Sequence, residues 1–171
     1  QDVLKKNLGG VTAREMAKLN RIKNWLGSSM AGAGPGGLNA HSANTVAAMF
    51  LATGQDAAQV VSSSSCVTIM EEEDDEKRPG SLRVSCTMPC LEIGTVGGGT
   101  ELGAQKACLS IMGIEGSSEV KKRPSGNHPE TLARIICATV MASELSLISA
   151  LCSQSHFFFF FCFSLISSHS F

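Results

Sequence analysis

The first third of the chain alternates helical patterns with loops of small residues. Apolar positions within Val11–Ile22 recur at intervals of three and four, which predicts an amphipathic helix. Residues Gly27–Gly37 are mostly glycine, serine and alanine, which predicts a loop. Pro35 lies in this segment and should exclude a regular element there. Asn39 is suited to cap a second helix that ends before Gly54. Most sides of this second helix carry small or apolar side chains, so we expect the helix to be buried.

The middle of the chain predicts a β-hairpin. Val60–Met70 is rich in apolar and β-branched residues and predicts a strand that is entered through serines. Leu82–Cys86 alternates apolar and polar positions and predicts a second, antiparallel strand. The charge run Glu71–Arg78 and the turn signal Pro79-Gly80 lie between them, so we expect a solvated, acidic tip. This tip lacks the spaced oxygen ligands and the fixed glycine of a calcium loop.

Two further helices are expected in the second half. Gln105–Met112 predicts a short helix, and its inward residues should be Ala107, Cys108, Ile111 and Met112. The polar, basic segment Ser117–His128 predicts a loop. Pro129 then opens the longest regular element, which carries few charges and should lie in the middle of a domain. Its apolar stripe consists of Leu132, Ile135, Ile136, Val140, Leu147 and Leu151.

Size, charge and cysteine spacing narrow the function classes. The chain has 171 residues, enough for one domain with a core, and a formal net charge of −1. This balance gives no electrostatic reason to expect a nucleic-acid partner, so a small molecule or another protein chain is favoured. The seven cysteines form no CxxC pair, and no second Cys/His pair follows at metal-ligand spacing. We interpret them as buried free thiols in a reducing compartment, and we expect no metal.

The C-terminal segment differs in composition from the rest. Phe157–Phe161 opens about ten mostly apolar residues, whereas a membrane-spanning helix needs roughly twenty, so we expect no membrane anchor in this chain. We divide the chain into a domain over residues 1–151 and an unrelated tail over residues 152–171, and we expect the long helix to end where the tail begins. Because pyrimidine-rich tracts encode Phe, Ser and Leu, our hypothesis is that the tail is intron read-through. A spliced transcript that encodes the phenylalanines would refute it.

A glycine-rich loop is the most distinctive motif. It occupies Gly94–Thr100 and follows the apolar run Ser85–Ile93. Glycines allow positive φ angles and let backbone N–H groups approach the phosphate or carbonyl oxygens of a ligand. The loop matches neither the phosphate loop with its Lys-Ser/Thr nor the GxGxxG dinucleotide turn. By itself it is equally consistent with a tight turn that leaves a strand.

Four sequence blocks point to one family. Asn39-Ala40-His41, Gly54–Gln59, Gly94–Thr100 and Glu144–Leu147 occur in this order. Over about residues 19–151 the chain resembles the catalytic region of the eukaryotic 3-hydroxy-3-methylglutaryl-coenzyme A (HMG-CoA) reductases. The resemblance implies an α+β fold that is part of the family's large, substrate-binding domain, with a long buried central helix and a small antiparallel sheet.

The resemblance also implies a reaction, a cofactor and a location. The family reduces HMG-CoA through a bound aldehyde to mevalonate and free CoA, with two hydrides from NADPH, in isoprenoid and sterol biosynthesis. The complete protein is expected at the endoplasmic reticulum membrane, with its catalytic part in the cytosol. It is also expected to form a homo-oligomer whose active sites lie between subunits.

By the same resemblance, several residues acquire expected roles. Asp56 matches the catalytic aspartate, which would bind a lysine, because a carboxylate beside an ammonium group lowers its own pKa and raises that of its partner. Lys23 matches a lysine that pairs with the substrate carboxylate, and Asn44 matches a residue of the substrate pocket. His41 lies in a matching motif, where a buried hydrogen bond is favoured over proton transfer. The expected cofactor-binding residues are Gly94, Thr95, Val96, Gly97 and Gly98.

Alternatives to these roles stay open. Asp56 is also suited to be a helix-terminal or turn aspartate, and Lys23 to be a solvent-facing lysine. If one unbroken helix joined Asn44 to Asp56, the two residues would lie about 18 Å apart, too far to touch one reacting carbon. Either the helix breaks between them, or they serve opposite ends of an extended site.

Several elements of the family's active site have no counterpart in this sequence. They are the catalytic glutamate and lysine, the cofactor segment Asp-Ala-Met-Gly-Met-Asn and the histidine proton donor, since His156 and His169 lie in no matching context. The chain also begins with Gln1 rather than Met, which we interpret as a start inside a larger gene product. We therefore expect a reductase fragment that is inactive alone. The alternative is a non-catalytic remnant or a subunit-interaction module.

Overall fold

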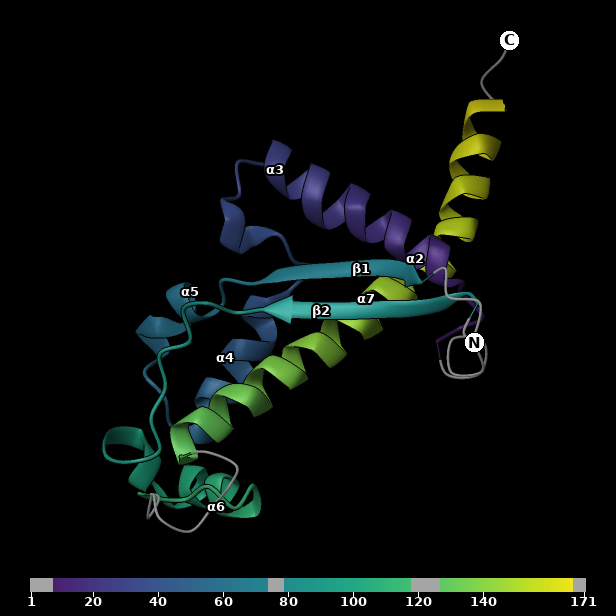
Figure 1. Ribbon diagram of the computed structural model, residues 1–171. Helices are drawn as coiled ribbons and strands as arrows, with labels where there is room; N and C mark the ends of the chain where they lie inside the picture. Colours follow the sequence, from purple (N-terminus) through teal and green to yellow (C-terminus); the bar gives the residue numbers. More distant parts are fainter. Residues whose placement is uncertain (1–7, 74–78, 118–126, 168–171) are drawn as a thin grey trace.

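The fold places helices on both sides of a two-stranded sheet. The computed structural model describes residues 8–73, 79–117 and 127–167, with side chains described as far as Ser153. Its elements are α2 (Ala13–Asn20), η1 (Arg21–Gly27), α3 (Ser28–Met30), η2 (Pro35–Gly37), α4 (Ser42–Thr53), η3 (Ala57–Gln59), α5 (Val60–Ser63), β1 (Val67–Glu73), β2 (Ser81–Thr87), η4 (Gly98–Glu101), α6 (Gly103–Ile111) and α7 (His128–Ser167). Figure 1 shows the α2–α3 segment on one side of the hairpin and α4 with α7 on the other. The expected α+β class is confirmed.

The first helix begins at a capping box and runs further than predicted. Thr12 Oγ1 accepts a hydrogen bond from the backbone N–H of Glu15 (3.2 Å), and Glu15 Oε2 accepts one from the backbone N–H of Thr12 (2.8 Å). The helix continues through the π-helical turn η1 and α3 to Met30, so the predicted loop begins later than Gly27. A single glycine inside a helix costs only about 1 kcal/mol, which the continuing helix offsets. The prediction that Pro35 excludes a regular element is also wrong, since it opens the short helix η2.

Helix α4 confirms one predicted boundary and corrects the other. Gly54 ends it in the left-handed conformation with φ of 70°. The helix begins at Ser42 and not directly after Asn39, although Asn39 Oδ1 still accepts a hydrogen bond from the Ser42 N–H (3.1 Å). The expectation that most sides would be buried is wrong, because only one stripe is buried, with Val46 and Phe50 at its centre. The other faces are exposed or half-buried, and they include Leu51, which is 66% exposed.

The predicted hairpin is present, with a shorter first strand. Strands β1 and β2 pair antiparallel, in a register that runs from Val67 opposite Thr87 to Glu73 opposite Ser81. Residues 60–63, predicted to enter the first strand, instead form the helical turn α5. The preceding turn η3 explains this, because the Asp56 side chain caps it and starts a helical path that α5 extends. The expected acidic tip at residues 74–78 lies outside the described residues.

The short helix after the glycine-rich loop is confirmed, but its buried face is not the predicted one. Leu109 is its buried residue, whereas Ile111 is 86% exposed. Ala107 is exposed as well, and Cys108 and Met112 are half-buried. The helix packs against α4, and this contact selects the Leu109 side. The loop predicted over Ser117–His128 lies mostly outside the described residues.

Helix α7 crosses the whole molecule. A buried stripe recurs every four residues as far as the side chains are described, at Leu132, Ile136, Val140, Glu144, Ile148 and Cys152, and Ser149 is buried beside it. A spacing of four turns the buried stripe slowly around the helix, since an α-helix has 3.6 residues per turn. The stripe can therefore face α4 first and α2 later. The predicted stripe is correct at Leu132, Ile136 and Val140, while Ile135, Leu147 and Leu151 are half-buried.

The expectation that this helix ends near Leu151 is wrong. Its backbone stays helical to Ser167, and neither glycine nor proline occurs between residues 152 and 167 to stop it. By length and composition, His128–Ser153 is apolar enough to cross a membrane. The same segment carries the buried stripe described above, so it serves in this fold as a core helix.

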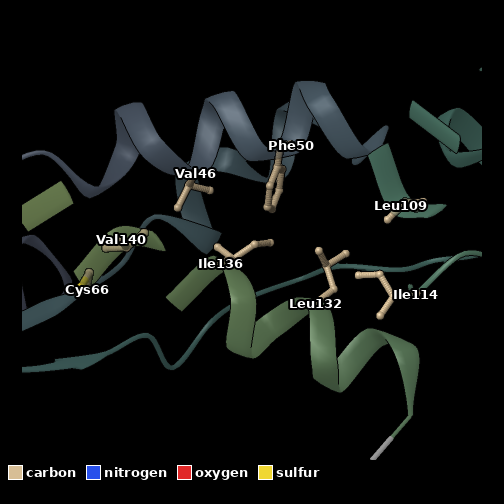
Figure 2. Packing of buried hydrophobic residues seen from close by; sticks show 8 residues of the cluster. All are labelled: Val46, Phe50, Cys66, Leu109, Ile114, Leu132, Ile136 and Val140. Carbon is tan, nitrogen blue, oxygen red and sulfur yellow. The ribbon is translucent and has the colours of Figure 1, made fainter. Parts of the chain in front are cut away.

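Two hydrophobic clusters lie along α7. The first joins α4, α6 and the N-terminal half of α7, and Figure 2 shows Phe50 and Val46 facing Ile136 and Leu132, with Leu109 and Ile114 beside them. The second cluster joins α2, β1 and the later part of α7, and it consists of Val11, Ala13, Met16, Met70, Ile148 and Cys152. Cys152 is therefore packed against the N-terminal helix. The well-packed part of α7 extends at least to this residue.

Candidate functional site

One group of predicted site residues surrounds a cavity beyond the C-terminal end of α4. The cavity has a volume of about 770 Å³ and lies between Gly54–Asp56 and the glycine-rich loop. Asp56 lines it, together with Gly94, Val96, Gly97 and Gly98. Thr95 does not, because it is buried and its hydroxyl donates to the carbonyl oxygen of Gly116 (2.9 Å). The structure thus brings Asp56 and four of the five expected cofactor-binding residues to one site.

The two walls of this cavity are joined by direct backbone packing. An added Cβ atom on Gly54 would lie 2.3 Å from the carbonyl oxygen of Gly99, and one on Gly99 would lie 2.7 Å from that of Gly54. No side chain fits at either position without a shift of the backbone. The Gln55 side chain adds a second link, because its amide donates to the Gly94 carbonyl (2.9 Å) and accepts from the Gly94 N–H (2.8 Å). The position of the loop is therefore tied to the segment that carries Asp56.

The glycine-rich loop leaves open space beside its backbone. Gly97 and Gly98 have φ angles of 78° and 57°, which favour glycine. Added Cβ atoms on Gly94, Gly97 or Gly98 would meet no atom within 4 Å. A ligand can therefore approach the backbone of these three residues closely.

Asp56 is an exposed carboxylate at the edge of the cavity. Its Oδ1 accepts a hydrogen bond from the backbone N–H of Ala58 (3.0 Å), which caps the turn η3. The residue is thus a turn aspartate that also lines the cavity. Within the described part of the chain, no Lys, Arg or His side chain forms an ion pair with it.

A second group of residues centres on Glu144, a buried carboxylate of α7. Its Oε2 accepts from the backbone N–H of Ala40 (2.7 Å) and the hydroxyl of Thr68 (3.1 Å). Its Oε1 accepts from the backbone N–H of His41 (2.8 Å) and lies 3.1 Å from Nδ1 of the same residue. Because a carboxylate only accepts, Nδ1 of His41 must carry the proton. The expected buried hydrogen bond of His41 is present.

Lys23 lies beside this second group. Its ammonium group donates to the carbonyl oxygen of Ala40 (3.4 Å) and to Oδ1 of Asn24 (3.5 Å). Asn24 in turn donates to Oδ1 of Asn20 (2.7 Å), and Asn20 donates to the Thr68 carbonyl (3.1 Å). Lys23 is half-buried and held by these polar contacts. It is therefore not simply a solvent-facing lysine.

Asn44 stands at the exposed face of the first turn of α4. Thr53 lies nine positions further along the helix, a rise of about 13 Å. The predicted site residues therefore form two groups. Lys23, His41 and Asn44 lie at the N-terminal end of α4, and Asp56 with the glycine-rich loop lies at the other end. Of the two alternatives drawn from the sequence, the first is met, because α4 ends at Thr53 and Gly54 breaks the helix before Asp56. The second alternative, an extended site with these residues at opposite ends, stays a prediction.

The described cysteines carry no disulfide. The Sγ atom of Cys66 lies 3.8 Å from the Thr68 hydroxyl oxygen. A hydrogen bond with Cys86 and burial together raise the pKa of the Cys66 thiol. Cys90 is exposed, so the expectation of uniformly buried thiols is wrong. Within the described ranges, no three His, Cys, Asp or Glu side chains gather in a metal-binding arrangement.

Sequence reasoning assigned no role to Glu144, Thr68 or Gln55, although Glu144 and Gln55 lie within the matching blocks Glu144–Leu147 and Gly54–Gln59. A signal for Glu144 was available, because it is the lone carboxylate in a long apolar stretch of α7. A charge that interrupts a core stripe must be satisfied by buried partners. Its partners could not be named from the sequence, since Ala40 lies 104 residues away.

The sequence model of the hydroxymethylglutaryl-coenzyme A reductase family matches residues 1–158. A reductase of this name from Strongylocentrotus purpuratus is 52% identical over 151 residues, which is 88% of this chain and 15% of the relative. Reductase 2 of Arabidopsis thaliana is 49% identical over 136 residues, or 80% and 23% of the two chains. The Drosophila melanogaster reductase is 53% identical over 139 residues, or 81% and 14%. This chain, which spans less than a quarter of each of these relatives, belongs to the HMG-CoA reductase family.

Proposed function

We propose that the chain is part of an NADPH-dependent HMG-CoA reductase that converts HMG-CoA to mevalonate and free CoA. The observation that supports this most directly is the shared cavity. Two separate matching blocks, Gly54–Gln59 and Gly94–Thr100, are locked together by the Gly54–Gly99 contact and the Gln55 side chain. Asp56 then faces the same space as the open backbone of the loop.

NADPH fits the glycine-rich loop in this proposal. Gly94, Gly97 and Gly98 would hold its nicotinamide side, because the space beside their backbone is empty of side chains. When bound, the cofactor supplies hydride. Asp56 lies at the rim of the same cavity, where its carboxylate would hold an ammonium group from another part of the complete protein and tune its proton. The Ala58 N–H fixes the carboxylate in place for this role.

The second residue group would bind the substrate. Lys23 offers an ammonium group for the substrate carboxylate, and Asn44 and His41 lie near it at the N-terminal end of α4. Because the two groups lie at opposite ends of α4, they would serve different parts of an extended ligand such as a CoA thioester. His41 has its Nδ1 engaged by Glu144, so it would act in positioning rather than as the proton donor.

The complete protein would be a homo-oligomer at the endoplasmic reticulum membrane, with active sites shared between subunits. The structure supports a subunit contact through an apolar row on the N-terminal helical segment. Ile22, Leu26 and Met30 follow one another at intervals of four and are exposed. Such a row stabilises a contact with another protein surface. It also favours the second candidate function, a non-catalytic module that retains only subunit contacts.

A mevalonate assay separates these functions. The 171-residue chain by itself is expected to form no mevalonate, because the family's catalytic glutamate, lysine and proton-donating histidine have no counterpart in it. A hybrid reductase, in which the matching part of this chain replaces the corresponding region of the Strongylocentrotus purpuratus relative, is expected to be active. If the chain alone formed mevalonate at a rate within a hundredfold of that of an intact reductase, it would not be an inactive fragment, and this part of the proposal would be refuted. A folded but inactive hybrid would favour the non-catalytic module.

A further inference from the structure

Glu144 is engaged by four donors in a symmetric arrangement. Each carboxylate oxygen accepts one backbone N–H and one side-chain donor, Ala40 with Thr68 on Oε2 and His41 twice on Oε1. The Glu144 side chain is completely inaccessible to solvent, whereas that of His41 is 24% exposed. A buried carboxylate is costly unless its oxygens are satisfied, and here both are. The carboxylate therefore fixes the turn at Ala40 and His41 directly before α4.

Two separate routes connect this carboxylate to Lys23. The first is a single residue, Ala40, whose N–H donates to Glu144 and whose carbonyl accepts from the Lys23 ammonium group. The second runs through Thr68, whose hydroxyl donates to Glu144 and whose carbonyl accepts from Asn20. Asn20 then accepts from Asn24, and Asn24 accepts from Lys23. Every step of both routes is a hydrogen bond, and both routes join Glu144 to Lys23.

Lys23 lies within the π-helical turn η1, a helix type that is rare and that often occurs at functional sites. A lysine has a long stem with four rotatable bonds, so its ammonium group needs external contacts to hold one position. Glu144 supplies the anchor for both sets of contacts, although it lies on a different helix and does not touch Lys23.

We propose that Glu144 is a positioning residue for substrate binding, which holds the Ala40–His41 turn and, through it, the Lys23 ammonium group where the substrate carboxylate is bound. This inference rests on the proposed function, and in particular on the role of Lys23 there. The inference adds a third requirement for substrate binding, beside Lys23 and the glycine-rich loop. This requirement is a buried acid in the central helix, and its loss should weaken the affinity for the substrate more than it lowers the turnover rate.

Glutamine is the informative substitution because it preserves size and removes one acceptor. A carboxamide has one acceptor oxygen, and its NH₂ group would face two donors wherever the other carboxylate oxygen had been. Either the Ala40 or the His41 backbone N–H then loses its acceptor, whichever way the amide is turned. The turn shifts, and Lys23 loses its Ala40 contact. Ser149→Ala is the matched control, because Ser149 is also buried on α7 but bonds only within its own helix, to the Ser146 carbonyl.

The test uses steady-state kinetics of the hybrid reductase. In Glu144→Gln, we expect the KM for HMG-CoA to rise at least tenfold, with kcat changed by less than threefold, since a contact to a non-reacting part of the substrate contributes equally to ground and transition states. Ser149→Ala should change both by less than threefold. A purely structural role of Glu144 would lower kcat with the fraction of folded enzyme and leave KM unchanged, and this result would overturn the proposal.

A Lys23→Met background separates the positioning role from the proposed function. Lys23→Met alone should raise the KM for HMG-CoA at least tenfold, and adding Glu144→Gln should raise it by less than a further threefold, because the two residues act on one contact. If Lys23→Met has no effect on KM, the substrate role of Lys23 fails, and the inference built on it fails too. If Glu144→Gln raises KM equally in both backgrounds, only the inference fails.

Amide hydrogen exchange of the 171-residue chain tests the anchor without any catalysis. The Ala40 and His41 amides should exchange at least tenfold faster in Glu144→Gln than in the unsubstituted chain, and Ser149→Ala should leave them unchanged. Equal exchange in all three proteins would overturn the proposal, even if the hybrid reductase proved inactive.

Discussion

Gly54 and Gly99 approach each other so closely that a Cβ atom on Gly54 would lie 2.3 Å from the carbonyl oxygen of Gly99. The contact lies where the end of α4 meets the glycine-rich loop, two segments 45 positions apart in the chain. Gly54 additionally has a φ angle of 70°. Backbone packing of this kind needs glycine on both sides, and it determines how the cavity beside Asp56 is shaped.

Alanine at Gly99 should therefore destabilise the fold. We expect Gly99→Ala to lower the free energy of unfolding by about 2 kcal/mol or more, because a Cβ there meets a backbone carbonyl that cannot rotate away. Urea unfolding measures this change. Gly103→Ala is the control, since that position has open space around it, and it should stay within about 0.5 kcal/mol of the unsubstituted chain. Equal stabilities for the two variants would contradict the close contact.

The side chain of Gln55 should be needed to hold the glycine-rich loop. Gln55→Glu keeps the size of the side chain, but a carboxylate cannot donate to the Gly94 carbonyl. We expect a loss of about 1–3 kcal/mol in stability and faster amide exchange at Gly94. Gln105→Glu is a suitable comparison, because Gln105 lines the same cavity but makes only a long, exposed hydrogen bond (3.4 Å). Unchanged exchange at Gly94 would show that the loop keeps its position without the amide.

The stability of the chain should depend on the Cys152 thiol at high pH. Burial, with a smaller contribution from the charge of Glu15, raises the pKa of Cys152 to about 11, whereas an unfolded thiol titrates near about 8.5. The folded state holds this proton more tightly, so the stabilisation is complete below about pH 8.5 and is lost as the pH rises toward 11. Urea unfolding between pH 8 and 11 should show a steeper loss of stability for the unsubstituted chain than for Cys152→Ala. Parallel pH profiles would contradict this assignment.

The C-terminal segment offers a prediction about solubility. Five consecutive phenylalanines form an aggregation-prone stretch, so a chain that ends at Ser153 should give more soluble protein than the full chain. A chain that ends at Leu151 should be less stable than one that ends at Ser153, because Cys152 packs in the cluster with Val11 and Met16. Soluble yield and thermal unfolding measure the two effects. Lower solubility or less cooperative unfolding after truncation at Ser153 would show that the tail belongs to the domain and would weaken the read-through hypothesis.

Local signals predicted much of the fold. Gly54 marks the end of α4 because the left-handed conformation favours glycine, and alternation predicted the hairpin of β1 and β2. The strand predicted at Val60 failed because the capping of η3 by Asp56 outweighed the preference of valine for strands. Val61 is 85% exposed, which shows that no sheet surface was available to it.

The candidate site was less predictable, because its contacts join distant segments. The family resemblance supplied Asp56, Lys23, His41 and the loop, and helix length raised a division between two ends as one open alternative, but neither gave the contacts that hold each group. The bonds of Glu144 reach 76 residues to Thr68 and 104 residues to Ala40. No periodicity or spacing encodes partners at such separations. Only the packing of α7 against the Ala40–His41 turn and β1 reveals them.

The most direct test of this account is the rate of mevalonate formation by the hybrid reductase with Asp56→Asn. Asparagine keeps the shape of the side chain and its capping bond to Ala58 but removes the charge. We expect kcat to fall at least about a hundredfold, as is typical when a group of an acid–base unit is lost, while the thermal midpoint stays unchanged. Glu92→Gln, which removes another carboxylate from the same cavity, should keep kcat within threefold. A hybrid that keeps most of its activity with Asp56→Asn, or that loses activity only by unfolding, would contradict a catalytic role for this cavity.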